Sequence, residues 1–102
     1  FVAAVSALTQ GRKCDVVYDS VGADTFPASL DCLRPLGTFA SFGQSSGSIP
    51  PFSMSILAQK GSLFVTRPTL FVYNARREDM VKSAEALFDV VKSGAVKIVI
   101  NQ

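Results

Sequence analysis

The chain has 102 residues, of which 48% are hydrophobic and 18% are charged, a composition typical of one small α/β domain or of part of a larger one. Ten Lys and Arg residues against eight Asp and Glu residues give a net charge of +2, which is too balanced to indicate binding to nucleic acid or to a membrane surface. No apolar run approaches the roughly 20 residues of a membrane-spanning helix, and no signal-peptide pattern is present, so we expect a cytoplasmic protein.

The start of the sequence and its two cysteines give two further expectations. A helical pattern already begins at Phe1 rather than after a Met, so we expect the sequence to be part of a longer chain. Cys14 and Cys32 occur in a chain without histidine, which leaves neither a common zinc spacing nor a Cys–His nucleophile. We therefore expect two small buried hydrophobic residues and no metal site.

The first part of the chain predicts two helix–strand pairs. Apolar residues at helical spacing over residues 1–8 predict a helix, and the stretch DVVYDSV, residues 15–21, predicts a buried strand. A second helix is expected over residues 24–34, because Asp24 or Thr25 suits its N-cap and Pro27 is tolerated in its first turn. Pro35 and Gly37 should end it. The stretch GTFASFG, residues 37–43, then predicts a second strand.

The second part of the chain repeats this alternation after a Ser-, Gly- and Pro-rich loop, QSSGSIPPFS. A short helix is expected over residues 54–61 and a third strand over residues 62–66. A long helix from about Arg77 to Ser93 follows, with an apolar stripe formed by Met80, Val81, Ala84, Leu87, Phe88 and Val91. The stretch VKIVI, residues 96–100, predicts a last strand.

Alternating helices and strands favour a parallel sheet with helices on its faces, here the second half of a Rossmann-type doubly wound α/β fold. Neither a G-x-G-x-x-G fingerprint nor a P-loop is present. The stretches DSVG and FGQSSG each follow a predicted parallel strand. Since ligands in open α/β sheets bind outside the carboxyl ends of the strands, these two loops are the expected ligand site.

Four stretches of the chain, DVVYDSVGADTF, SLDCLRPLGTFASFGQSSG, QKGSLFVTRPTL and EALFDVVKSGAVKI, resemble the quinone oxidoreductases of the medium-chain dehydrogenase/reductase superfamily, the group that includes zeta-crystallin. The resemblance implies a zinc-independent, NADPH-dependent enzyme that transfers hydride to quinones or related electron-poor carbonyls and alkenes. It also implies that residues 1–94 are the later part of the nucleotide-binding domain and that residues 95–102 begin the return to the catalytic domain.

The resemblance further implies a set of cofactor-binding residues at three loops and a mode of dimerisation. The cofactor neighbours would be Ser20, Val21, Phe42, Gly43, Gln44, Ser45, Phe64 and Thr66. The family often has Asn where this chain has Gln44. Gln has the same amide group on a longer side chain, so the amide lies farther from the backbone. No catalytic residue is assigned, because the cofactor carries the hydride chemistry. The strand from Ser62 to Thr66 would form a homodimer across a two-fold axis.

Other interpretations of these residues and of the chain stay open. Ser20 can simply close a turn with its hydroxyl, and Arg67 can be a solvated charge rather than a phosphate ligand. Phe26, Phe39 and Phe88 are expected in the core, which leaves Phe42 for stacking. The main functional alternative is a non-catalytic structural or dimerisation module that retains the half-Rossmann fold; a methyltransferase-type fold would leave the later stretches unexplained. We expect the isolated 102 residues to be inactive.

Overall fold

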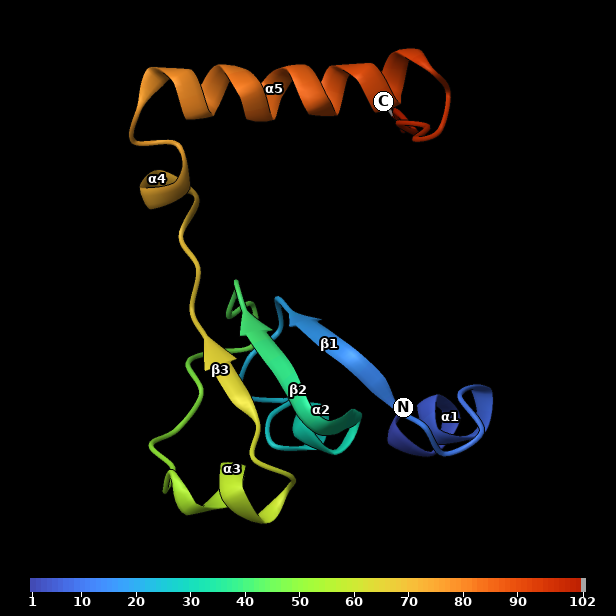
Figure 1. Ribbon diagram of the computed structural model, residues 1–102, viewed down its shortest axis with the longest axis vertical. Coiled ribbons are helices and arrows are strands. Elements are labelled where there is room, and N and C mark those ends of the chain that lie inside the picture. The colour runs from blue at the N-terminus through green and yellow to red at the C-terminus, as the bar shows by residue number, and fades with distance from the viewer. Residues whose placement is uncertain (102) are drawn as a thin grey trace. The chain divides into compact units, whose positions relative to one another are not determined.

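A computed structural model describes residues 1–101 and shows eight elements of regular structure (Figure 1). The elements are α1 (Val2–Leu8), β1 (Cys14–Asp19), α2 (Ala28–Asp31), β2 (Leu33–Ser41), α3 (Ser55–Gln59), β3 (Phe64–Thr66), α4 (Leu70–Tyr73) and α5 (Arg77–Lys92). They belong to two compact units: the first is Phe1–Pro68, and the second begins at Thr69. Among residues 1–101, no helix combines the length and the hydropathy needed to cross a membrane.

The first unit contains a parallel sheet in the order β1-β2-β3. Figure 1 shows the three arrows running side by side in one direction. Val17 of β1 pairs with Phe39 of β2, which in turn pairs with Val65 of β3. The expected α/β fold with a parallel sheet and flanking helices is therefore confirmed, and each of the three predicted strands in this unit forms.

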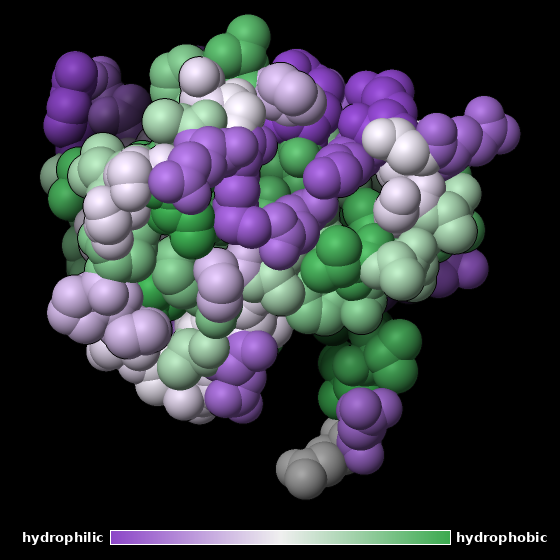
Figure 2. Space-filling view, turned by 90° about the horizontal axis from the view of Figure 1, so that it is seen from below, coloured by the Kyte–Doolittle hydropathy of each residue, from purple (hydrophilic) through white to green (hydrophobic). Residues whose placement is uncertain are grey.

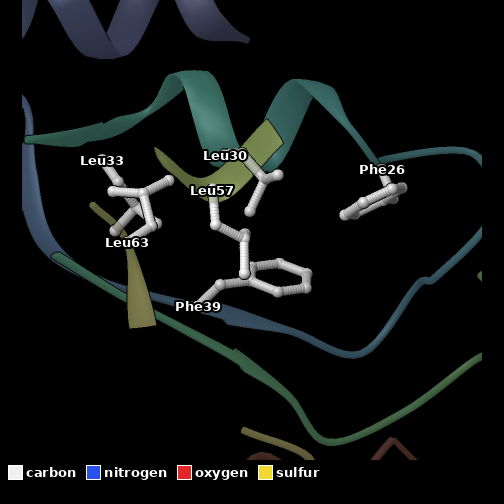
Figure 3. Packing of buried hydrophobic residues seen from close by; sticks show 6 residues of the cluster. All are labelled: Phe26, Leu30, Leu33, Phe39, Leu57 and Leu63. Atoms are coloured by element: carbon white, nitrogen blue, oxygen red, sulfur yellow. The ribbon is translucent and has the colours of Figure 1, made fainter. Parts of the chain in front are cut away.

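The core of the first unit lies on one face of this sheet. Phe39 at its centre is 1% exposed and packs with Leu30 of α2 and Leu57 of α3. Figure 3 shows these side chains pointing toward one another, together with the remaining members of the cluster, Phe26, Leu33 and Leu63. Helices α2 and α3 thus cover the same face of the sheet, and this packing fixes the three strand ends that follow.

The prediction of a helix over residues 24–34 is wrong in its extent. The segment before Pro27 is a turn, in which the N–H groups of Thr25 and Phe26 both donate to the carbonyl oxygen of Gly22, at 3.1 and 3.0 Å. Helix α2 then lasts only four residues. It ends before Cys32 because the carbonyl oxygen of that residue accepts the N–H of Cys14 at 2.9 Å, which starts the pairing of β1 with β2.

Strand β2 consequently begins at Leu33, earlier than the predicted residues 37–43, and passes through Pro35. The pairing jumps from Cys14 with Leu33 to Val16 with Thr38, so that β2 carries extra residues against β1. Pro35 lies within this irregular stretch, where its missing N–H removes no ladder hydrogen bond. A proline in a central strand is therefore compatible with the sheet.

In the second unit, the long helix was predicted correctly from the sequence, whereas the other elements differ from the prediction. Helix α5 confirms the expected helix from about Arg77, while the short helix α4 within the preceding loop was not predicted. The predicted strand over residues 96–100 is wrong: these residues form no regular structure. A strand needs a ladder partner, and the sheet of the described residues contains only β1, β2 and β3.

The expectation that Phe88 is a core residue is also wrong. Its side chain is 56% exposed, and no residue of α5 is buried. Exposed large hydrophobic side chains occur in the first unit as well, including Tyr18 and Phe64. On the face drawn in Figure 2, hydrophobic surface lies in several patches between hydrophilic side chains. Apolar surface of this kind is typical of a region that contacts further protein.

Candidate functional site

The ends of the three parallel strands bring three loops to one edge of the sheet. Asp19, the last residue of β1, pairs with Ser41, the last residue of β2. The β1 loop (residues 20–24) and the β2 loop (residues 42–48) therefore leave the sheet side by side, and Arg67 follows β3 at the same edge. This is the carboxyl edge, where parallel sheets bind ligands.

The β1 and β2 loops are joined by hydrogen bonds. The N–H groups of Ser45 and Ser46 donate to the carbonyl oxygens of Ser20 and Val21, at 3.1 and 2.8 Å. The Ser46 hydroxyl group also donates to the Val21 oxygen at 2.8 Å and accepts the N–H of Asp24 at 3.0 Å. The two loops thus form one backbone surface rather than two independent segments.

Two glycines permit this close approach. A Cβ atom on Gly43 would lie only 2.6 Å from the carbonyl oxygen of Ser20, and one on Gly22 would collide with the carbonyl oxygen of Gly47. Gly22 also has a φ of +93°, a conformation that side chains disfavour. Any larger residue at these positions would push the loops apart.

The carboxylate of Asp19 lies beneath the β1 loop and is 5% exposed. Its Oδ1 atom accepts the N–H groups of Val21 at 2.8 Å and Gly22 at 3.0 Å. Its Oδ2 atom accepts the hydroxyl groups of Thr25 at 2.7 Å and Ser29 at 2.8 Å. A side chain that appears in the sequence as the end of a strand therefore makes four contacts with the loop and with the segment that enters α2.

These contacts decide the charge state of Asp19. Burial of the carboxyl group by itself raises its pKa. The hydrogen bonds from Thr25, Gly22, Ser29 and Val21 favour the ionised form and outweigh burial, so that the pKa of Asp19 lies below its ordinary value. The carboxylate is therefore ionised at neutral pH and acts as an acceptor only, which suits the orientation of a loop rather than proton transfer.

A cavity of about 520 Å³ opens beside the β2 loop, within the range of ligand pockets. Most of its wall is apolar, and its polar groups gather toward the strand ends. It is lined by Phe39, Ser41, Gly43, Gln44, Ser48, Ile49, Pro50, Pro51, Phe52, Met54, Val65, Thr66 and Arg67. The cavity thus combines an apolar wall with an amide, hydroxyl groups and one guanidinium.

Three of the residues that the sequence marked as cofactor neighbours line this cavity, namely Gly43, Gln44 and Thr66. Ser20 and Val21 line a second hollow of about 270 Å³, which is also lined by residues of α1, β1 and α2. The hydrogen bonds between the loops connect the two groups. The structure therefore brings these five residues to one edge of the sheet.

The other three predicted residues lie on the surface. Phe42 and Phe64 are 51% and 60% exposed, and Ser45 is exposed as well. None of the three lines either cavity. Phe42 and Ser45 still belong to the β2 loop, whereas Phe64 is two residues from the end of β3.

The sequence interpretation missed Ser46 and the apolar wall of the cavity. The hydrogen bonds of Ser46 reach residues more than twenty positions away, so no local pattern reveals them. Phe52 lines the cavity and also packs on Phe26 of the core, with ring centroids 4.8 Å apart. The Pro-Pro-Phe stretch at residues 50–52 was the available signal, although it indicated only a loop.

Metal ligands are not grouped in this part of the chain. Among residues 1–101, no three His, Cys, Asp or Glu side chains lie together as a metal site requires. Cys14 is half-buried and Cys32 is buried, and both are free thiols. Burial raises the pKa of the Cys32 thiol, which disfavours its thiolate form.

Known proteins match the chain over nearly its whole length. It is 50% identical over 98 residues to a quinone oxidoreductase of Pseudomonas aeruginosa. This match covers 96% of this chain and 30% of that protein. It is 44% identical over 97 residues to a 2-haloacrylate reductase of Burkholderia sp., and this match covers 94% of this chain and 29% of that protein. The chain therefore spans about 30% of the length of the curated relatives it matches.

The fold agrees with that of a solved relative. The Escherichia coli quinone oxidoreductase complexed with NADPH superposes with a TM-score of 0.91 at 45% identity, covering 97% of this chain and 30% of the other. The model of the family described as zinc-binding dehydrogenase matches residues 1–88. Sequence and fold lead to the same assignment: this chain belongs to the zinc-binding dehydrogenase family.

Proposed function

We propose that the chain is part of an NADPH-dependent quinone oxidoreductase and supplies the nicotinamide side of its cofactor site. The observation that carries this proposal is the pair of hydrogen-bonded loops at the carboxyl edge of a parallel sheet, next to a largely apolar cavity. The similarity to quinone oxidoreductases, one of them solved with NADPH, supports the choice of cofactor.

In this proposal the loops bind and orient the cofactor. The backbone at Ser20, Val21, Gly43 and Ser45 forms its support, because small residues let a ligand approach the main chain closely. Bound NADPH would supply the hydride. The apolar wall of the cavity would exclude water from the reacting region, as cofactor sites require.

The remaining predicted contacts would contribute side chains. Gln44 and Thr66 place an amide and a hydroxyl group in the cavity wall, where each can hydrogen-bond a polar ligand group. Phe42, which is exposed, offers a ring for stacking, and Phe64 would contact the cofactor only if its side chain turned toward the strand end. None of these residues is assigned an acid or base role.

The substrate class is a conjugated, electron-poor acceptor. Quinones and haloacrylates, which are named in the two curated relatives, share a carbon–carbon double bond conjugated to a carbonyl group, so hydride can add to either. The apolar wall of the cavity suits the conjugated carbon skeleton that these acceptors share.

Several further properties form part of the proposal. Residues 1–94 would be the later part of the nucleotide-binding domain, and residues 95–102 would begin the return to the catalytic domain. The enzyme would be zinc-independent, as the resemblance to quinone oxidoreductases implies. A cytoplasmic location is proposed as well, in keeping with the balanced charge of the chain.

Homodimerisation through β3 is also proposed. In the described sheet β3 is an edge strand, with its outer hydrogen-bonding groups free to meet another chain. Its residues Phe64 and Val65 are exposed although both are hydrophobic. An edge strand with such side chains suits a symmetric contact with a second copy.

The test is a steady-state assay of the full-length protein with NADPH and an acceptor. We expect NADPH oxidation with 1,4-benzoquinone or 2-chloroacrylate, and no stimulation by added zinc. Gln44→Ala should raise the KM for NADPH, whereas Gln59→Ala, which removes an exposed amide from α3, should leave it unchanged. Absence of NADPH binding and turnover with both acceptors would contradict the proposal and favour the non-catalytic module.

A further inference from the structure

The carboxylate of Asp19 divides its contacts between two parts of the structure. Oδ1 accepts two backbone N–H groups of the β1 loop, those of Val21 and Gly22. Oδ2 accepts the hydroxyl groups of Thr25 and Ser29, in the segment that enters and forms α2. One buried side chain thus links the loop to the helix that packs on the sheet.

The contacts of Asp19 determine which backbone groups of the β1 loop are available to hydrogen-bond the β2 loop. Because the N–H groups of Val21 and Gly22 are turned back toward Oδ1, the loop curls around the carboxylate. In this conformation the carbonyl oxygens of Ser20 and Val21 accept the N–H groups of Ser45 and Ser46. The position of the β2 loop therefore depends on a loop shape that Asp19 holds.

We propose that Asp19 is a positioning residue, which anchors the β1 loop to α2 and through that loop sets the position of the β2 loop beside the cavity. The inference rests on the proposed function in that these loops are the ones that would hold NADPH. Asp19 itself lines the smaller hollow and is absent from the wall of the larger cavity. Its effect on the cofactor is therefore exerted through the backbone.

Two substitutions of Asp19 distinguish the effect of its anchoring hydrogen bonds from the effect of its negative charge. Asn in place of Asp19 keeps Oδ1 as acceptor for the loop, and its amide group can donate to Thr25 and Ser29, whose hydroxyl oxygens also accept. Thr25 then donates to the carbonyl oxygen of Gly22, which lies 3.1 Å from its Oγ1 atom. Asp19→Asn thus removes the charge and keeps the anchor, whereas Asp19→Ala removes both.

The experiment measures two quantities on the full-length protein: the Kd for NADPH, and the hydrogen-exchange rate of the Ser46 amide without ligand. Asp19→Ala should raise the Kd about tenfold, as expected for the loss of about one net hydrogen bond, and should accelerate exchange at Ser46 by a similar factor. Asp19→Asn should stay within about threefold of the unmodified protein in both.

Two further variants make the result independent of overall stability. Leu33→Val and Leu33→Ala lower the Tm from a buried position at the opposite end of β2, so one of them can be matched to Asp19→Ala. The matched variant should leave both the Kd and the Ser46 exchange rate unchanged. If Asp19→Ala does not fold, Thr25→Val combined with Ser29→Ala cuts the helix side of the anchor and should show the same two effects.

The outcomes distinguish this inference from the proposed function. If the unmodified protein does not bind NADPH, the proposed function fails, and the exchange rate of Ser46 still decides whether Asp19 positions the loops. If Asp19→Ala and the matched Leu33 variant behave alike, Asp19 is only a structural residue. If Asp19→Asn is as impaired as Asp19→Ala, the charge matters and positioning is overturned.

Discussion

At the scale of single residues, Gly43 is one of the two positions, with Gly22, at which the β1 and β2 loops approach each other most closely. A methyl group there meets the backbone of Ser20, and backbone atoms cannot move aside as the end of a flexible side chain can. Gly43 is not among the glycines with positive φ, so the requirement for glycine here comes from space alone. The close contact, rather than an unusual backbone conformation, makes this residue special.

Gly43→Ala is therefore expected to separate the loops. We expect it to lower the free energy of unfolding by about 1–3 kcal/mol, as overpacking does, and to weaken NADPH binding. Denaturant unfolding and NADPH titration of the full-length protein measure the two effects. An alanine variant with unchanged NADPH affinity would show that the loops tolerate separation.

Gly11→Ala is the matched control for this prediction. Gly11 has a φ of +81° and nothing within 4 Å of its Cβ position, so alanine adds backbone strain without a clash. It should cost about 1–2 kcal/mol in stability and leave the NADPH affinity unaltered. A loss of affinity in this variant as well would indicate a general effect of destabilisation.

The sequence predicted part of the site and not the rest, for a physical reason. Short apolar runs that end in glycine and serine indicated the loops at Ser20 and Gly43, because strand ends have a local signature. The role of Ser46 depends on hydrogen bonds to residues more than twenty positions away, and the contacts of Asp19 with Thr25 and Ser29 depend on a turn where a helix was expected. A single sequence does not display such pairings.

At the scale of elements, the strands agreed with prediction better than the short helices did. Apolar runs mark the strands because Val17 of β1 and Phe39 of β2 face the core, as does Leu63 directly before β3. Helix α2 was overestimated because Asp19 draws the hydroxyl group of Thr25 into a turn, a contact that propensity does not include. Tertiary hydrogen bonds decided this boundary.

The prediction at the scale of elements concerns strand β3 and the proposed dimer. Phe64→Pro and Val65→Pro should each convert the proposed homodimer to monomers, measured by light scattering coupled to size exclusion on the full-length protein. Neighbouring N–H groups of a strand point to opposite sides, so one proline removes a hydrogen bond to β2 and the other an outward-facing donor. The proline that removes only an outward-facing donor should lower the Tm less than the other, because it loses the dimer contact but keeps the pairing with β2.

An unchanged dimer in both proline variants would contradict dimerisation through β3. Ser62→Ala is a suitable control, because Ser62 precedes β3 and its exposed side chain can be shortened without loss of a backbone donor. This variant should remain a dimer.

At the scale of the whole molecule, each sheet face has a different environment. Helices α2 and α3 cover the face of Phe39, whereas Tyr18 and Phe64 belong to the opposite face and are 75% and 60% exposed. The second unit likewise leaves the apolar stripe of α5 uncovered. Surfaces of this kind need further protein to exclude water.

The isolated 102-residue chain is therefore expected to bind a hydrophobic dye such as ANS and to show no NADPH oxidation with quinone. The full-length protein should bind much less dye, because the same surfaces are covered, and should be active. Fluorescence titration and the steady-state assay compare the two. Turnover of a quinone by the isolated chain at an enzyme-like rate would contradict this expectation.

The hydrogen bonds between the β1 and β2 loops also bear on how such a protein can be re-engineered. Transplanting one loop from a relative would set a foreign backbone against Gly22 or Gly43, where there is no room for a Cβ atom. The two loops are therefore a single exchangeable module, to be swapped together or not at all. Libraries that vary residues 20–24 and 42–48 jointly should yield more folded members than libraries that vary either loop alone.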